Sequence, residues 1–248
     1  MRQLEGKVAI VTGANRGIGK AIATAYALEG AYVALVCRSE PAATVKEIEN
    51  AGGKCAVFHY DFADVAGTEK LVKDVAGKCG TIDILFNNAG TQSRHPCTEF
   101  PLDDWTRVLD INCNAVFFMC QQAGKVMIEK GYGKIINMAS LLSFQGGLTV
   151  PAYAASKGAV MQFTKSLSNE WAKLGVNVNC IAPGYLDTEM NAALINDPVR
   201  SRQILERIPA GRWGKAEDIA GAAVFLASSA SDYVTGIVLP VDGGWLGR

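Results

Sequence analysis

Short apolar runs alternate with longer helix-like stretches along the chain, and this alternation constrains the fold more than any other sequence feature. Most runs are apolar almost throughout and are flanked by Gly, Asn or Asp, which is typical of parallel strands buried on both faces. Strands that alternate with helices indicate a parallel sheet with right-handed crossovers. The predicted strands are Val8–Val11, Val33–Val36, Ala56–Tyr60, Ile82–Phe86, Lys134–Met138, Val176–Ile181 and Ile237–Val241.

The chain reads as one domain. Its 248 residues are an ordinary length for a single α/β unit, and 49% hydrophobic residues suffice for a large core. No linker, repeat or low-complexity segment divides it, so we predict a single doubly wound Rossmann domain over residues 1–248, with a parallel sheet of about seven strands flanked by helices. The least regular stretch, residues 187–214, is interpreted as an insertion that covers the substrate, with a plain surface excursion as the alternative.

Composition excludes several classes of function. Lys plus Arg and Asp plus Glu number 24 each, so no charge excess favours a nucleic acid or an anionic membrane as partner. The seven cysteines are odd in number and form no C-x-x-C pair, and the two histidines are far apart in sequence, so we expect neither a disulfide framework nor a metal site. Without a signal-like N-terminus or a spanning apolar run, the expected location is cytoplasmic.

A glycine-rich turn follows the first predicted strand. It reads Thr12-Gly13-Ala14-Asn15-Arg16-Gly17-Ile18-Gly19, with the spacing G-x-x-x-G-x-G. Such a turn lets the backbone approach a pyrophosphate closely, and the helix that follows presents its N-terminal amides to the phosphates. The turn therefore predicts a dinucleotide site, although glycine turns precede many helices.

The end of the second strand indicates which dinucleotide binds. NAD-preferring sites place a carboxylate there for the ribose 2′-hydroxyl, whereas this strand ends in Cys37 and Arg38. Arg38 and Arg16 can make charge-assisted bonds to a 2′-phosphate, so NADP(H) is predicted over NAD(H); the alternative is that both arginines are only solvated. Asp61 is a candidate partner of the adenine amino group, and residues 87–90 (Asn-Asn-Ala-Gly) suit close contact with the cofactor.

Tyr153 and Lys157 lie four residues apart in a predicted helix, on one face and one turn from each other. A tyrosine hydroxyl with a reference pKa of about 10 becomes a useful base only where a nearby cation favours the phenolate. Such a pair is also common on ordinary helix surfaces. Ser140, after the fifth strand, and Asn112, in the helical stretch after the fourth, strengthen the catalytic interpretation, because a serine can bond the substrate oxygen and an asparagine can hold a water for proton relay.

These pieces together resemble the short-chain dehydrogenase/reductases over essentially the whole chain. The resemblance implies that Tyr153 is the general acid/base, that Lys157 lowers its pKa and binds the nicotinamide ribose, that Ser140 orients the carbonyl and that Asn112 supports the relay. It also implies that Thr188 and Ile181 engage the nicotinamide amide. The predicted cofactor-binding residues are Gly13, Asn15, Arg16, Gly17, Ile18, Gly19, Arg38, Asp61, Phe62, Asn88, Ala89, Gly90, Tyr153, Lys157, Pro183, Gly184 and Thr188.

Three longer stretches, residues 143–147, 207–214 and 224–246, resemble 2-deoxy-D-gluconate 3-dehydrogenases and gluconate 5-dehydrogenases, which implies a sugar acid or polyol as substrate. Arg94 is the candidate for the carboxylate, with Gln145 and Tyr185 beside it. Two alternatives stay open: a reductase of 3-oxoacyl groups on a carrier protein or of varied ketones, and a non-catalytic NADP(H)-sensing protein. The helical stretches Trp105–Ile128 and Tyr153–Leu174 are apolar on more than one face, which predicts an oligomer, and the resemblance implies a homotetramer.

Overall fold

The computed structural model describes residues 2–248, and a seven-stranded parallel sheet forms their centre, in the order β3-β2-β1-β4-β5-β6-β7. The predicted α/β class and the seven strands are therefore confirmed. The strand bounds are β1 Val8–Thr12, β2 Tyr32–Cys37, β3 Lys54–His59, β4 Ile84–Asn87, β5 Gly133–Met138, β6 Val176–Pro183 and β7 Val238–Val241.

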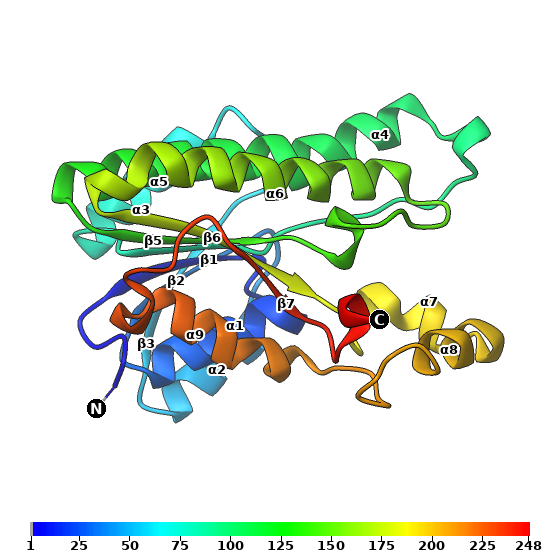
Figure 1. Cartoon of the computed structure of the whole chain (residues 1–248). Coiled ribbons are helices and arrows are strands. Elements are labelled where there is room, and N and C mark those ends of the chain that lie inside the picture. Colours follow the sequence, from blue (N-terminus) through cyan, green and yellow to red (C-terminus); the bar gives the residue numbers. More distant parts are fainter. Residues whose placement is uncertain (1) are drawn as a thin grey trace.

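Helices cover both faces of the sheet. Figure 1 shows α3, α4, α5 and α6 on one face and α1, α2 and α9 on the other, with α7 and α8 at the end of the sheet where the C-terminus lies. The helix bounds are α1 Gly17–Leu28, α2 Ala42–Asn50, α3 Thr68–Cys79, α4 Leu102–Leu109, α5 Ala115–Lys130, α6 Pro151–Trp171, α7 Ala192–Ile195, α8 Pro198–Leu205 and α9 Ala220–Ala227. Within residues 2–248, no helix combines the length and the apolar character that crossing a bilayer requires.

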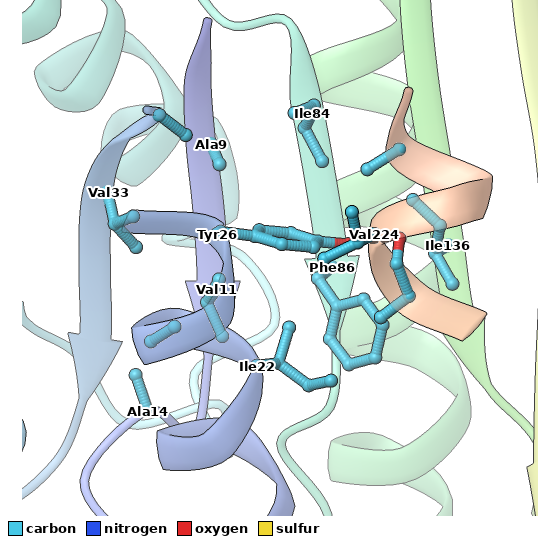
Figure 2. Packing of buried hydrophobic residues seen from close by; sticks show 14 of the residues in the cluster. Ala9, Val11, Ala14, Ile22, Tyr26, Val33, Ile84, Phe86, Ile136 and Val224 are labelled. Carbon is cyan, nitrogen blue, oxygen red and sulfur yellow. Dashed lines mark hydrogen bonds between the residues drawn. The ribbon is translucent and has the colours of Figure 1, made fainter. Parts of the chain in front are cut away.

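Each face of the sheet has its own apolar core. Figure 2 shows Tyr26 of α1 lying between the sheet and α9. Its ring meets that of Phe86 edge-on at 6.1 Å between centroids, and its buried hydroxyl donates a hydrogen bond to the Ala223 carbonyl at 3.1 Å. A buried tyrosine needs such an acceptor, because an unpaired hydroxyl in an apolar core is costly. This contact fixes α1, and with it the glycine turn, against the sheet.

The predicted helical stretch Trp105–Ile128 is interrupted in the structure. A π-helical turn at Asp110–Asn114 separates α4 from α5. π-helical turns are rare and occur often at functional sites. The side chain of Asn112 lies in this turn and is fully buried, so the interruption turns one polar side chain inward from an otherwise apolar helix. A sequence periodicity cannot detect a single extra residue of this kind.

The strand order indicates at which end of the sheet a ligand is expected to bind. The chain passes outward from β1 to β2 and β3 and then returns to β4 on the other side of β1, so neighbouring crossovers diverge between β1 and β4. Ligands of open parallel sheets bind beyond the carboxyl ends of the strands at such a point. The glycine turn after β1 and residues 87–90 after β4 both lie there, and α7 and α8 extend from the same end of the sheet (Figure 1).

Candidate active site

The turn after β1 requires glycine at defined positions. Gly13 and Gly17 have φ values of +67° and +52°, which favour residues without a side chain. A Cβ on Gly19 would lie 2.1 Å from the Gly13 carbonyl oxygen, so only glycine lets α1 start this close to the turn. A Cβ on Gly17 would meet no atom within 4 Å, and no side chain caps the start of α1. The backbone amides therefore face open space, as a pyrophosphate requires.

Two asparagines at the carboxyl end of β4 hold the sheet together at this turn. The Asn88 side-chain amide donates to the Thr12 carbonyl at 3.0 Å, and the Thr12 hydroxyl accepts the Asn88 and Ala89 N–H groups at 2.9 Å each. The buried Asn87 donates to the Asn137 side chain at 2.9 Å. Asn87 thus ties β4 to β5, while Asn88 also reaches the cavity described below.

The two arginines predicted for the 2′-phosphate lie at the outer side of the glycine turn. Asn15 bonds the Ser39 hydroxyl at 2.9 Å, which brings the turn against the end of β2. The Arg38 side chain is 80% exposed and lies 3.7 Å from an Asp61 carboxylate oxygen. The Arg16 side chain is also largely exposed and pairs with Glu189. Both guanidiniums are thus open to an incoming anion, which would replace contacts that solvent already weakens.

Ser140, Tyr153 and Lys157 come together although they lie on different elements. Ser140 follows β5 directly, whereas Tyr153 and Lys157 lie on α6. Ser143 joins the two segments, because its hydroxyl accepts the Ser140 N–H at 3.3 Å and donates to the Lys157 carbonyl at 2.7 Å. Burial raises the pKa of the Tyr153 hydroxyl, and a hydrogen bond with Ser140 acts in the opposite direction. Burial is the larger of the two effects, and it favours the neutral phenol.

Lys157 is almost completely buried at the base of this group, with 3% of its surface exposed. Its ammonium donates to the Met138 carbonyl at 2.6 Å and lies 5.6 Å from the centre of the Tyr153 ring. Burial lowers the pKa of Lys157 to about 8. The lysine therefore still carries its charge at neutral pH, beside the Tyr153 ring.

The Asn112 side chain makes three hydrogen bonds to other parts of the protein. Its oxygen accepts the Thr91 N–H at 2.8 Å, and its amide donates to the Thr91 carbonyl at 2.8 Å and to the Ser156 hydroxyl at 3.2 Å. It does not reach the cavity surface. These bonds tie the loop after β4 to the start of α6, and the predicted support of a proton relay stays a prediction.

One cavity of about 310 Å³ collects most of the predicted reactive residues. Its wall includes Ser140, Tyr153, Lys157, Ile18, Asn88, Gly90, Pro183, Gly184, Thr188, Arg94 and Tyr185. The remaining predicted cofactor residues lie outside this wall, around the glycine turn and the ends of β2 and β3. Phe62 is 8% exposed and packs in the core, and Ile181 is fully buried in β6.

Gln145, predicted beside the substrate, is not part of the cavity wall. Its side-chain oxygen accepts bonds from the Trp245 indole at 3.3 Å and the Arg207 guanidinium at 3.4 Å, which anchors the C-terminal turn to the loop after β5. The structure adds Gln92, Thr149 and Arg200 to the cavity wall instead. Arg200 lies within the irregular stretch 187–214, and no periodicity or motif there distinguishes it from other arginines.

The chain matches a family model described as enoyl-(acyl carrier protein) reductase over residues 13–246. It is 51% identical to the 2-dehydro-3-deoxy-D-gluconate 5-dehydrogenase of Pseudoalteromonas atlantica, over 99% of this chain and 98% of that protein. A crystal structure from Agrobacterium tumefaciens with bound NADP, described as a candidate 2-deoxy-D-gluconate 3-dehydrogenase, shares 52% identity at a TM-score of 0.95, with 99% and 98% coverage. A gluconate 5-dehydrogenase from Burkholderia cenocepacia, crystallised with NADP and tartrate, shares 40% identity at a TM-score of 0.95, with 99% and 97% coverage.

Proposed function

The chain belongs to the short-chain dehydrogenase/reductase family, and on that premise we propose that it interconverts a secondary alcohol and a ketone on a sugar acid with NADP(H) as cofactor. The observation that carries the proposal is the cavity itself: Ser140, Tyr153 and Lys157 share its wall with arginine, and none of the lining residues is Asp or Glu. Relatives about half identical over nearly the full chain carry sugar-acid dehydrogenase names, which agrees with an anionic substrate.

The catalytic roles follow from the positions around the cavity. Tyr153 exchanges a proton with the substrate oxygen, and Ser140 donates a hydrogen bond to the same oxygen. The Lys157 charge favours the Tyr153 phenolate when the hydroxyl substrate loses its proton. When bound, NADP(H) accepts or supplies the hydride. Because burial raises the pKa of Tyr153, the neutral phenol suits proton donation to a ketone, and oxidation of the alcohol should become faster as the pH rises.

Asn112 acts as a positioning residue in this scheme. It bonds both backbone groups of Thr91 and the hydroxyl of Ser156, so it holds the loop after β4 beside α6. Its support of proton relay would act through this placement.

NADP(H) fits the residues at the glycine turn. Gly17 leaves open space at the start of α1, and Arg16 and Arg38 lie exposed where the 2′-phosphate is expected. Two similar structures were crystallised with NADP. The ratio of kcat/KM for NADPH and NADH measures the preference. Arg38→Asp should reverse the preference towards NADH, and an unchanged ratio would remove Arg38 from the phosphate site.

The cavity wall also contains Arg94, which we assign to the substrate carboxylate. It follows residues 87–90 and has no carboxylate partner among the described residues. The similar Burkholderia enzyme was crystallised with tartrate, a dicarboxylate, which agrees with anion binding. Arg94→Ala should raise KM for a sugar acid far more than for a neutral ketone, and equal effects on both would reject the assignment. Tyr185 flanks the same cavity and contributes a hydroxyl for the substrate.

The stretch 187–214 is assigned the role of a substrate cover. It contains α7 and α8 and contributes Thr188, Asn191 and Arg200 to the cavity wall. Its contact with the glycine turn, between Glu189 and Arg16, brings it near the cofactor end as well.

Assembly into a homotetramer is part of the proposal. Leu102 of α4 and Phe118 of α5 are 76% and 38% exposed, and such apolar groups are expected at subunit contacts. Light scattering after size-exclusion chromatography measures the mass directly. The seven cysteines are all unpaired, which agrees with a reducing compartment such as the cytoplasm.

The central experiment follows absorbance at 340 nm while the protein, NADP⁺ and each of a panel of sugar acids, polyols and ketones react. The expected result is turnover of a sugar acid, abolished by Tyr153→Phe with NADP⁺ affinity retained. The description of the matching family model makes acyl thioesters the second class to include. Preference for a carrier-protein thioester would replace the sugar-acid proposal, and cofactor binding without turnover of any class would indicate a sensor.

A further inference from the structure

The cavity has a one-sided charge. Its charged lining residues are Arg94, Lys157 and Arg200, and the wall contains no Asp or Glu. Lys157 is committed to the Met138 carbonyl beside Tyr153. The positive potential available to the distal part of a substrate therefore comes from the two arginines, and clustered charge of one sign in a cleft attracts a ligand of the opposite sign.

Arg200 is oriented towards the cavity by the packing of its helix. The Asp197 side chain caps α8 and accepts the Val199 and Arg200 N–H groups at 2.9 and 3.0 Å, which fixes the first helical turn. One turn later, Ile204 is 3% exposed and packs against Leu141. Residues four apart share a helix face, so the buried Ile204 directs Arg200 to the inner side of α8.

Arg202, two residues further along α8, provides the contrast. Its side chain is 80% exposed and bonds the Glu206 carboxylate at 2.7 Å, on the outer side of the helix. Arg200 is partly buried, and its recorded side-chain contact within the described chain is a hydrogen bond from Nη1 to the neutral Gln203 side chain at 3.0 Å. On one helix, the charge of Arg202 is thus paired with a carboxylate, whereas Arg200 bonds only a neutral side chain.

The pairing of arginines extends this contrast to the whole described chain. Six arginines lie within 4 Å of a carboxylate oxygen, namely Arg2, Arg16, Arg38, Arg107, Arg202 and Arg212. Of the other four, Arg94 and Arg200 line the cavity, whereas Arg207 bonds the Gln145 side chain and Arg248 bonds the Glu206 carbonyl. A guanidinium bonds a carboxylate through two parallel N–H groups, and both cavity arginines keep such pairs of donors available.

We propose that Arg200 is a specificity-determining residue that binds the substrate carboxylate together with Arg94. This inference rests on the proposed function and adds to it a second cation, supplied by the covering segment and not by the sheet. Arg94 comes from the loop after β4 and Arg200 from α8, so an anionic substrate links the two parts of the site. A neutral substrate cannot make this link.

The test compares Arg200→Gln with Arg202→Gln, a matched control on the same helix. In the NADP⁺-dependent reaction with the preferred sugar acid, Arg200→Gln should raise KM about 10- to 100-fold, the loss expected for a charge-assisted hydrogen bond, and should leave kcat nearly unchanged. Arg200→Lys should recover part of the loss. With the neutral carboxamide of the same acid, the wild type and Arg200→Gln should have similar KM values. Equal KM values for Arg200→Gln and Arg202→Gln with the acid would overturn the proposal.

A binding measurement separates this inference from the proposed function. Calorimetric titration of the NADP⁺-loaded protein with D-gluconate and with tartrate should show weaker binding in Arg200→Gln and wild-type affinity in Arg202→Gln. If no sugar acid is turned over, the proposed function fails, and the titration still decides the role of Arg200. If neither carboxylate binds to the wild type, or if both bind Arg200→Gln as tightly, the assignment of Arg200 is wrong.

Discussion

Two buried lysines lie at the two ends of β5, and they differ in their hydrogen-bond partners. At the amino end, Lys134 is 1% exposed, and its ammonium bonds the Asp232 carboxylate at 2.7 Å and the Asn177 side chain at 2.8 Å. At the carboxyl end, Lys157 of α6 bonds the Met138 carbonyl and has no carboxylate partner among the described residues.

This difference separates a structural charge from a functional one. A buried cation with an anionic partner contributes to a defined packing arrangement. A buried cation with only a carbonyl partner is unfavourable in the folded state, and burial accordingly lowers the pKa of Lys157 to about 8. The chain retains this unfavourable group beside Tyr153, in the wall of the candidate active-site cavity. Stability and activity should therefore respond in opposite ways to substitutions at the two ends.

The largest expected effect is on turnover. Lys157→Met should lower kcat/KM by about 1000-fold or more, because it removes the charge that favours the Tyr153 phenolate, whereas Lys134→Met should stay within about threefold of wild type per folded molecule. Steady-state rates at saturating NADP⁺, normalised to folded protein by circular dichroism, measure both. Comparable losses of kcat/KM in the two variants would show that the two lysines do not differ in their importance for turnover.

The next effect is the pH dependence of stability. The pKa of Lys157 is about 8 in the folded state and about 10.4 when the chain is unfolded, so the unfolded state binds more protons between these values. The cost of the buried charge is complete below pH 8 and disappears as the pH rises towards 10.4, a change of about 3 kcal/mol. Lys157→Met should be more stable than wild type at pH 7 by about 2 kcal/mol, since the lost hydrogen bond offsets part of the gain.

Urea unfolding of wild type and Lys157→Met between pH 7 and pH 10 tests this expectation. The difference in the free energy of unfolding should shrink steadily as the pH rises. A difference that stays constant over this range would show that Lys157 has an ordinary pKa in the folded protein.

The third effect is a loss of stability at the other end. Lys134→Met should lower the free energy of unfolding by about 2 kcal/mol, because the hydrogen bonds of the ammonium to Asp232, Asn177 and Ser231 are lost. Lys54→Met, an exposed lysine on β3, is the control and should change stability by less than about 0.5 kcal/mol. If Lys134→Met is as stable as wild type, the ion pair makes no net contribution to the free energy of unfolding. The two buried lysines would then not differ in their effect on stability as their partners predict.

The smallest expected effect is the change in the free energy of unfolding of Asp232→Asn, which tests how much the Lys134 partner contributes. The Asp232 side chain is 64% exposed, so its charge is screened, and Asp232→Asn keeps an acceptor for the ammonium. The expected loss is below about 1 kcal/mol in the same unfolding assay. A loss as large as that of Lys134→Met would mean that the carboxylate charge, and not the packing of the lysine, maintains this end of the strand.

Most of the fold could be predicted from local patterns. Apolar runs bounded by turn residues located all seven strands to within a few residues, because strands buried on both faces cannot contain many polar groups. The boundary errors have physical causes. The first two residues of the predicted fourth strand, Ile82 and Asp83, lie outside β4, and the Asp83 carboxylate instead accepts the Val8 N–H at 2.8 Å and pairs with Lys130.

The candidate site could be predicted only in part. The i, i+4 spacing and the positions after strands brought forward Ser140, Tyr153, Lys157 and the glycine turn, and the structure places the three side chains around one cavity. Gln145 and Arg200 show the limit of this reasoning. Both are polar residues in irregular segments, and whether such a side chain meets the cavity or the protein depends on contacts from distant parts of the chain, such as Trp245 for Gln145.

The sequence by itself thus determined the class of fold and brought forward Ser140, Tyr153, Lys157 and the glycine turn as candidates, because periodicity and spacing act over a few residues along the chain. Only the tertiary structure decided which of two buried lysines has a carboxylate partner, which arginine of α8 faces the cavity and that Asn112 bonds Thr91 and Ser156. Those outcomes depend on burial and on partners far away in sequence, and the free energy of a polar side chain is set by these surroundings more than by its neighbours along the chain.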